Sequence, residues 1–126
     1  MPARIAIVRT GPRNACPVRW CCRHPKQFVC LGCHLSTQEM LRRVPREKPD
    51  LLILDTAVLN GGGFRPVSLV RRVVPEIPVL VISKRSDAPT VLSALINGAT
   101  GYLLKGAQRG QSRIIVDPAW LIVGGA

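Results

Sequence analysis

Long apolar segments are missing from this sequence of 126 residues. No run approaches the roughly 18 apolar residues that a membrane span needs. The apolar stretch near the N-terminus, Ile5 to Val8, stops at Arg9 and is shorter than the core of a secretory signal, which is about 7–15 residues long. We therefore expect a cytoplasmic protein without a membrane partner. No internal repeat or low-complexity linker divides the chain, and its length suits one hydrophobic core.

Acidic residues are also scarce, with 7 Asp and Glu against 18 Lys and Arg and a net charge of +11. Residues 1–48 carry most of the basic excess. Such an excess favours polyanions in general, because each neutralised phosphate releases counterions. A solvated basic surface accounts for the same composition, so charge gives only weak support for a nucleic-acid partner.

Short apolar runs alternate along the chain with segments of helical periodicity. Ser36 and Glu39 form a capping-box pattern before one such segment, and Asn97-Gly98 is a C-cap signal after another. Alternation of this kind indicates an α/β fold with a parallel sheet and helices on both faces. We expect strands at 4–8, 27–31, 51–55, 79–83 and 102–104, and helices at about 37–47, 64–74 and 87–96.

Three polar residues fall at the expected carboxyl ends of strands, where parallel sheets carry their functional groups. Asp55 precedes Ser83 by 28 residues, and Ser83 precedes Lys105 by 22. The segments PDLLILD, VLVIS and NGATGYLLK surround them, and Gly63 follows Asp55 by eight residues. This combination resembles the receiver domain of two-component response regulators, most closely receivers that precede a LuxR-type helix-turn-helix output domain.

The resemblance implies a fold and a role for each residue. The fold is a flavodoxin-like (CheY-like) three-layer sandwich with a five-stranded parallel sheet in the order 2-1-3-4-5. Asp55 would be the phosphoacceptor, Ser83 and Lys105 would contact phosphoryl oxygens, and Tyr102 would be the aromatic switch residue. Such a module is a signalling domain and not an enzyme. Its partner would be a sensor histidine kinase or another signalling protein, bound at the face of the fourth helix and fifth strand. A homodimer would use the face made by the fourth helix, fifth strand and fifth helix.

The sequence departs from the family at the end of the first strand. Two acidic residues hold Mg²⁺ there in the family, and Arg9 and Thr10 stand at those positions. Leu59 replaces a usual proline, and Lys84 replaces a small residue. We therefore expect a degenerate receiver that works by protein–protein contact without a cofactor, with Arg9 forming an ion pair to Asp55.

Residues 12–35 form an atypical segment that holds all five cysteines. One interpretation is a zinc site made by Cys22, His24, Cys30 and Cys33. A second is haem attachment at Cys30, Cys33 and His34, although haem is normally attached after export. A third is a relic of compensated frame shifts, with accidental cysteines. The alternative function is accordingly a small zinc-binding or nucleic-acid-binding module on a receiver scaffold, using residues 9–48.

We expect residues 1–105 to be the receiver-like domain and residues 106–126 to be an irregular tail, with no output domain in this chain. Gly106, Gly110 and Asp117-Pro118 interrupt any long helix in the tail. The first and last helices of the fold would thus be irregular or missing. The apolar pieces RIIV and AWLIV of the tail are expected to cover the edge of the sheet.

Overall fold

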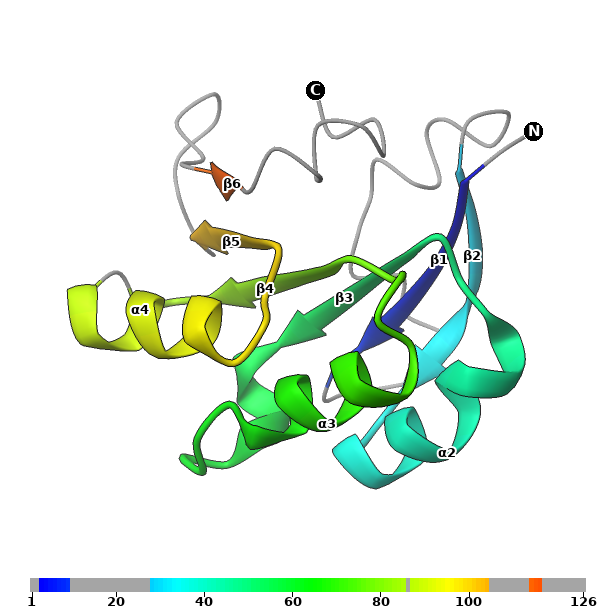
Figure 1. The fold of residues 1–126 in the computed structure, drawn as a ribbon, viewed down its shortest axis with the longest axis horizontal. Coiled ribbons are helices and arrows are strands. Elements are labelled where there is room, and N and C mark those ends of the chain that lie inside the picture. Colours follow the sequence, from blue (N-terminus) through cyan, green and yellow to red (C-terminus); the bar gives the residue numbers. More distant parts are fainter. Residues whose placement is uncertain (1–2, 10–27, 86, 105–113, 117–126) are drawn as a thin grey trace.

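A computed structural model describes residues 3–9, 28–85, 87–104 and 114–116 of the chain. Its centre is one six-stranded sheet in the order β2-β1-β3-β4-β5-β6 (Figure 1). Strands β1 to β5 are mutually parallel, and β6 is antiparallel to β5. The expected α/β fold with a parallel sheet is confirmed. The strands are β1 Ala3–Val8, β2 Phe28–His34, β3 Leu51–Asp55, β4 Val79–Ser83, β5 Gly101–Leu104 and β6 Ile114–Val116.

Three α-helices, α2, α3 and α4, pack on one face of this sheet (Figure 1). Their buried residues join one hydrophobic cluster with every second residue of the strands, including Ala6, Leu52 and Val81. A short 3-10 helix, η1, follows β3 directly. The helices are α2 Thr37–Glu47, η1 Thr56–Leu59, α3 Arg65–Val73 and α4 Ala88–Ile96. Within the described residues no helix is long and apolar enough to cross a membrane.

The predicted start of α2 is confirmed by its hydrogen bonds. The backbone N–H of Glu39 donates to the Ser36 hydroxyl over 3.1 Å, and the Glu39 carboxylate accepts from the N–H of Leu35 over 3.4 Å. The first contact satisfies a donor that the first helical turn leaves without a partner, and the second binds the residue before the N-cap. Helix α4 ends as expected at Asn97, followed by Gly98 with a φ of 107°.

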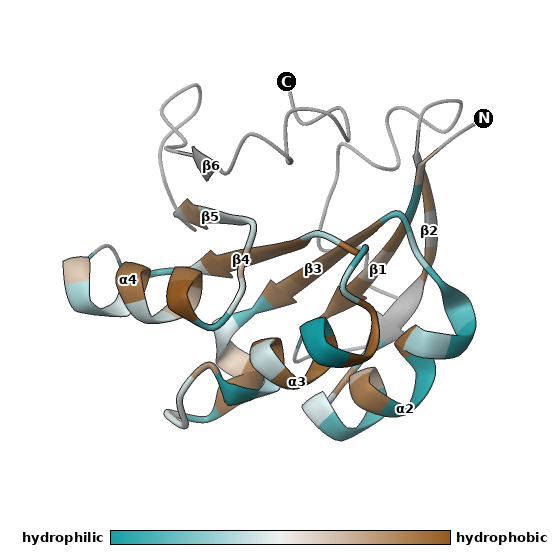
Figure 2. Ribbon diagram, in the orientation of Figure 1, coloured by the Kyte–Doolittle hydropathy of each residue, from teal (hydrophilic) through white to brown (hydrophobic). Residues whose placement is uncertain are grey.

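Strand β3 is buried on both of its faces, as its uninterrupted apolar run predicts. Leu52 and Leu54 point to the helices, while Leu51 and Ile53 point to the opposite face, and all four are at most 2% exposed. Figure 2 shows the same apolar character along β1, β3 and β4. The strand therefore lies in the middle of the core, and its last residue, Asp55, marks the point where the core ends.

Two segments differ from the sequence-based expectation. Strand β2 continues to His34, beyond the predicted 27–31, because it pairs with β1 along its length and accommodates Leu31 as an extra residue in a bulge. The tail is not wholly irregular, since Ile114–Val116 pairs with β5 as strand β6. The expected irregularity of the first and last helices concerns segments 10–27 and 105–113, which lie outside the described residues.

Candidate functional site at the carboxyl ends of the strands

The sheet brings three of the predicted site residues, Arg9, Asp55 and Ser83, to one edge. Val8 is paired with Leu54, so the residues that follow them, Arg9 and Asp55, come next to each other at the ends of β1 and β3. Asp55 is in turn paired with Ile82, and Ser83 is the next residue of β4. Parallel strands place their carboxyl ends at the same edge, which explains why residues far apart in sequence meet here.

Asp55 is half-buried and begins η1 as its N-cap, with its carboxylate accepting a hydrogen bond of 3.0 Å from the N–H of Ala57. Ser83 is only 1% exposed. Its hydroxyl lies 3.1 Å from the hydroxyl of Thr56 and accepts a hydrogen bond of 3.1 Å from the N–H of Arg85. The Ser83 hydroxyl is thus held by the residue after Asp55 and by the loop after β4.

Tyr102 is buried within the sheet, with 1% of its surface exposed. Its hydroxyl donates a hydrogen bond of 2.6 Å to the carbonyl of Arg85. The backbone of Arg85 therefore bonds to Ser83 through its N–H and to Tyr102 through its carbonyl. The sequence predicts roles for Ser83 and Tyr102 but gives no sign that one residue connects them, because that connection depends on the conformation of the β4–α4 loop.

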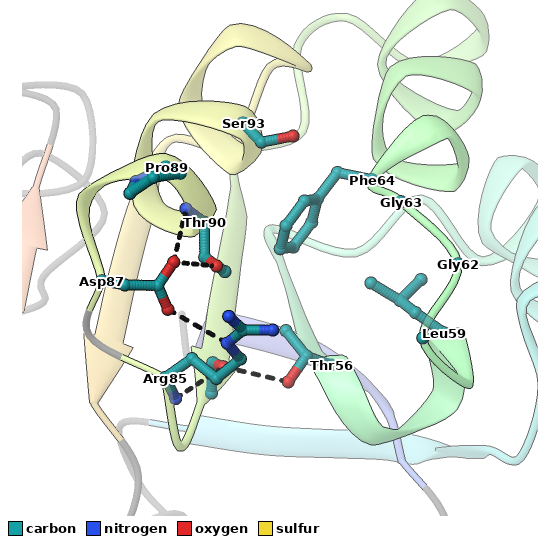
Figure 3. A pocket seen from close by; sticks show the side chains of 12 residues that line it. Thr56, Leu59, Gly62, Gly63, Phe64, Arg85, Asp87, Pro89, Thr90 and Ser93 are labelled. Carbon is teal, nitrogen blue, oxygen red and sulfur yellow. Dashed lines mark hydrogen bonds and ion pairs between the residues drawn. The ribbon is translucent and has the colours of Figure 1, made fainter.

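A pocket of about 410 Å³ opens beside these groups (Figure 3). Leu59 and Phe64 line it on the η1–α3 side, and Pro89 and Thr90 line it on the α4 side. Ser83 also contributes to its wall. The remaining lining residues are Thr56, Gly61, Gly62, Gly63, Arg85, Asp87 and Ser93.

Asp87 connects this pocket to helix α4, of which it is the N-cap. Its carboxylate accepts hydrogen bonds from the Thr90 hydroxyl and N–H, at 2.6 and 3.1 Å, and forms an ion pair of 3.0 Å with Arg85. The hydrogen bond from the Thr90 side chain, with smaller contributions from the Thr90 N–H and from Arg85, lowers the pKa of Asp87. These contacts therefore favour the charged form of the Asp87 carboxylate at the start of α4.

The donors at this edge do not fit the Mg²⁺ ion that the family resemblance implies. Arg9 directly follows β1, and its N–H donates to the carbonyl of His34 over 2.9 Å. A guanidinium cannot ligate a cation that requires carboxylate or carbonyl oxygens. Among the described side chains no group of three His, Cys, Asp or Glu is arranged to hold a metal. Thr10 and Lys105 lie outside the described residues.

His34 makes a contact that the sequence did not predict. Its ring is 1% exposed, and Nε2 lies 2.7 Å from the carboxylate of Glu47. Nδ1 lies 3.7 Å from Glu39 and is buried without a hydrogen-bond partner. Arg43 forms an ion pair of 3.1 Å with Glu39 and approaches Glu47 at 3.9 Å. The cluster links the end of β2 to helix α2. Binding of His34 to a haem iron through Nε2 would have to displace Glu47 from that nitrogen.

The two cysteines nearest to His34 lie in an extended backbone. Cys30 and Cys33 belong to β2, where Cys33 is paired with Ile7 of β1. Pairing with β1 keeps the backbone between Cys30 and Cys33 extended, whereas a C-x-x-C half of a zinc site suits a tight turn. Cys22 and His24, the other two proposed ligands, lie outside the described residues.

Comparison with known proteins identifies the family to which this arrangement belongs. Residues 5–117 match the response regulator receiver domain. The chain belongs to this family. The predicted resemblance to receivers of LuxR-type regulators is therefore confirmed.

Several regulators are similar to this receiver domain. A probable C4-dicarboxylate response regulator, DctR, of Bacillus subtilis is 34% identical over 68 residues, which cover 54% of this chain and 30% of DctR. The DNA-binding transcriptional activator DevR/DosR of Mycobacterium tuberculosis is 29% identical over 70 residues, which cover 56% of this chain and 32% of DevR/DosR. The chain thus matches about a third of the length of these relatives.

Solved structures agree with the fold. A LuxR-family two-component response regulator from Aurantimonas sp. superimposes with a TM-score of 0.70 at 21% identity, covering 86% of this chain and 77% of that one. The receiver domain of the response regulator NarL from Mycobacterium tuberculosis gives a TM-score of 0.69 at 23% identity, with coverages of 86% and 87%. At these identities the likeness establishes the fold alone.

Proposed function

We propose that this receiver domain is a pseudo-receiver, which signals by protein–protein contact and does not accept a phosphoryl group through Mg²⁺. The observation that carries the proposal is the position of Arg9 beside Asp55 at the ends of paired strands. A cation fixed at this position repels a second cation and attracts the carboxylate. In this proposal the guanidinium of Arg9 pairs with Asp55 and takes the place of the metal.

The remainder of the switch is retained in this proposal. Ser83 and Tyr102 are both buried and are both bonded to the backbone of Arg85. A protein that changes the β4–α4 loop would therefore change both side chains together. The unit is a cytoplasmic, non-enzymatic receiver-type sandwich of residues 1–105 with five parallel strands, and Lys105 would take its family position near Asp55.

The contact surface that we propose includes helix α4. Leu92 and Ile96 lie one turn apart on its outer side and are 55% and 81% exposed. Helix α4 contains no charged residue. An exposed apolar stripe of this kind fits a protein partner better than water. The partner in this proposal is a sensor histidine kinase, another signalling protein or a second copy of the chain.

The decisive experiment is incubation of the protein with acetyl phosphate and Mg²⁺, followed by intact mass measurement. We expect no mass gain, because the carboxylates that would hold the metal are replaced. A gain of one phosphoryl group that is absent from Asp55→Asn would refute the proposal. As a positive control, the variant Arg9→Asp with Thr10→Asp is expected to acquire Mg²⁺ affinity, measured by isothermal titration.

Contact through α4 is tested with Ile96→Ser, which shortens the apolar stripe without adding charge. We expect weaker self-association or weaker capture of a kinase partner than in the unchanged protein. The matched control is Val73→Ser, because Val73 is a similarly exposed aliphatic residue, at 60%, on a different helix. Equal effects of both substitutions would show that α4 has no special role.

A further inference from the structure

We infer that the outer surface of helices α2 and α3 binds the phosphate backbone of double-stranded nucleic acid without regard to sequence. This inference goes beyond the proposed signalling role and uses a different surface. Its basis is a set of four arginines that the fold gathers on one side of the molecule. We call this set the α2–α3 arginine face: Arg42, Arg46, Arg65 and Arg72.

Helical periodicity places these arginines away from the core. In α2 the buried residues are Met40 and Val44, and Arg42 and Arg46 lie on the opposite side of the helix. In α3 the buried residues are Val67 and Val70, opposite the other two arginines of the face. All four arginines are exposed. Helices α2 and α3 pack against each other on the same face of the sheet, so the two pairs form one surface (Figure 1).

Most carboxylates of the described residues are engaged elsewhere. Glu39 and Glu47 contact Arg43 and His34, and Asp50 accepts a hydrogen bond of 2.7 Å from the N–H of Arg4. Asp87 pairs with Arg85 at the start of α4. In the part of the chain that the structure describes, no ion pair reaches any arginine of the face. The four guanidinium groups of this surface are therefore available to bind an external anion.

The spacing and chemistry of the face fit phosphates. Arg42 and Arg46 are about 6 Å apart along their helix, and Arg65 and Arg72 about 10.5 Å, at a rise of about 1.5 Å per residue. Phosphates of one DNA strand recur about every 3.4 Å along the duplex axis, so the two separations span about 1.8 and 3.1 phosphate steps. Guanidinium groups bind phosphate oxygens in a bidentate manner. Like charges four residues apart oppose helix formation, and a bound phosphate would relieve that repulsion.

The test measures binding of the full chain to a fluorescent DNA duplex of about 20 base pairs by anisotropy at several salt concentrations. Four phosphate contacts predict a slope of log K against log salt of about −3.6, which is roughly a 100-fold loss of affinity for a fourfold rise in salt. In the variant Arg42→Gln, Arg46→Gln, Arg65→Gln and Arg72→Gln we expect the slope to become shallower by about 3.6 units. Its melting temperature should not fall, because the four side chains are exposed.

The matched control removes the same charge from the other basic part of the chain. The variant Arg13→Gln, Arg19→Gln, Arg23→Gln and Lys26→Gln also loses four positive charges. We expect its slope to change by about 1 unit or less. An equal or larger change in the control would overturn the inference, because net charge alone would then account for binding. Absence of binding by the unchanged protein at low salt, or stronger binding to polyglutamate than to the duplex, would also overturn it.

Discussion

Removal of residues 111–126 would delete strand β6 and turn β5 into an edge strand. Three residue pairs join the two strands, Gly101 with Val116, Tyr102 with Ile115 and Leu103 with Ile114. An antiparallel ladder of this length holds roughly two or three backbone hydrogen bonds, each with a net contribution of about 0.5–1.5 kcal/mol. We therefore expect the free energy of unfolding to fall by about 2 kcal/mol, and Tm by roughly 5–15 °C.

The truncated chain should also associate with itself, because the backbone N–H and C=O groups of β5 would become a template for another strand. Differential scanning calorimetry and sedimentation velocity measure the two effects. The matched control is deletion of residues 117–126, which keeps β6 and shortens the same tail. If the longer deletion leaves Tm unchanged and the protein monomeric, or if both deletions act equally, pairing of β6 with β5 does not stabilise the domain.

Three other changes test the local structure. Ser36→Ala removes the N-cap of α2 and should lower the free energy of unfolding by about 1 kcal/mol in urea titrations, whereas Ser36→Asp should not. Gly98→Ala should cost more than about 1 kcal/mol, because Gly98 has a φ of 107° and a new Cβ would lie 3.0 Å from Cγ of Arg71; unchanged stability would show that the turn relaxes. Thr90→Val should raise the pKa of Asp87 toward its ordinary value, measured by NMR titration. Because that pKa is lowered in the folded state, the stabilisation is present above the ordinary carboxyl pKa and is lost as pH falls through the lowered value.

The strands and helices that local patterns predicted were found close to their expected positions. The run from Leu51 to Leu54 is apolar at every residue, so its burial on both faces follows from composition alone. Helix α2 starts where Ser36 and Glu39 can exchange hydrogen bonds with neighbouring N–H groups. Such features depend on residues within one turn or one strand of each other, which the sequence displays directly.

The site was predictable in position and only partly in its contacts. Asp55 and Ser83 could be assigned to strand ends because the family spacing and the apolar runs agree. The role of the Arg85 backbone could not be predicted, since any residue type supplies an N–H and a carbonyl. The bond between the Thr56 and Ser83 hydroxyls likewise joins two strand ends that become neighbours only when β3 and β4 pair.

The sequence by itself determined the parallel α/β architecture and the family, because both are set by residue identity and short-range order, and it predicts that Arg9 and Thr10 replace the metal-binding acids. Tertiary structure decided the extension of β2 to His34, the ion-pair cluster around that histidine and the pairing of β6 with β5. These features join residues of different secondary-structure elements. Their free energy depends on backbone pairing and burial that exist only when the distant partner is in place, and no local pattern encodes that partner.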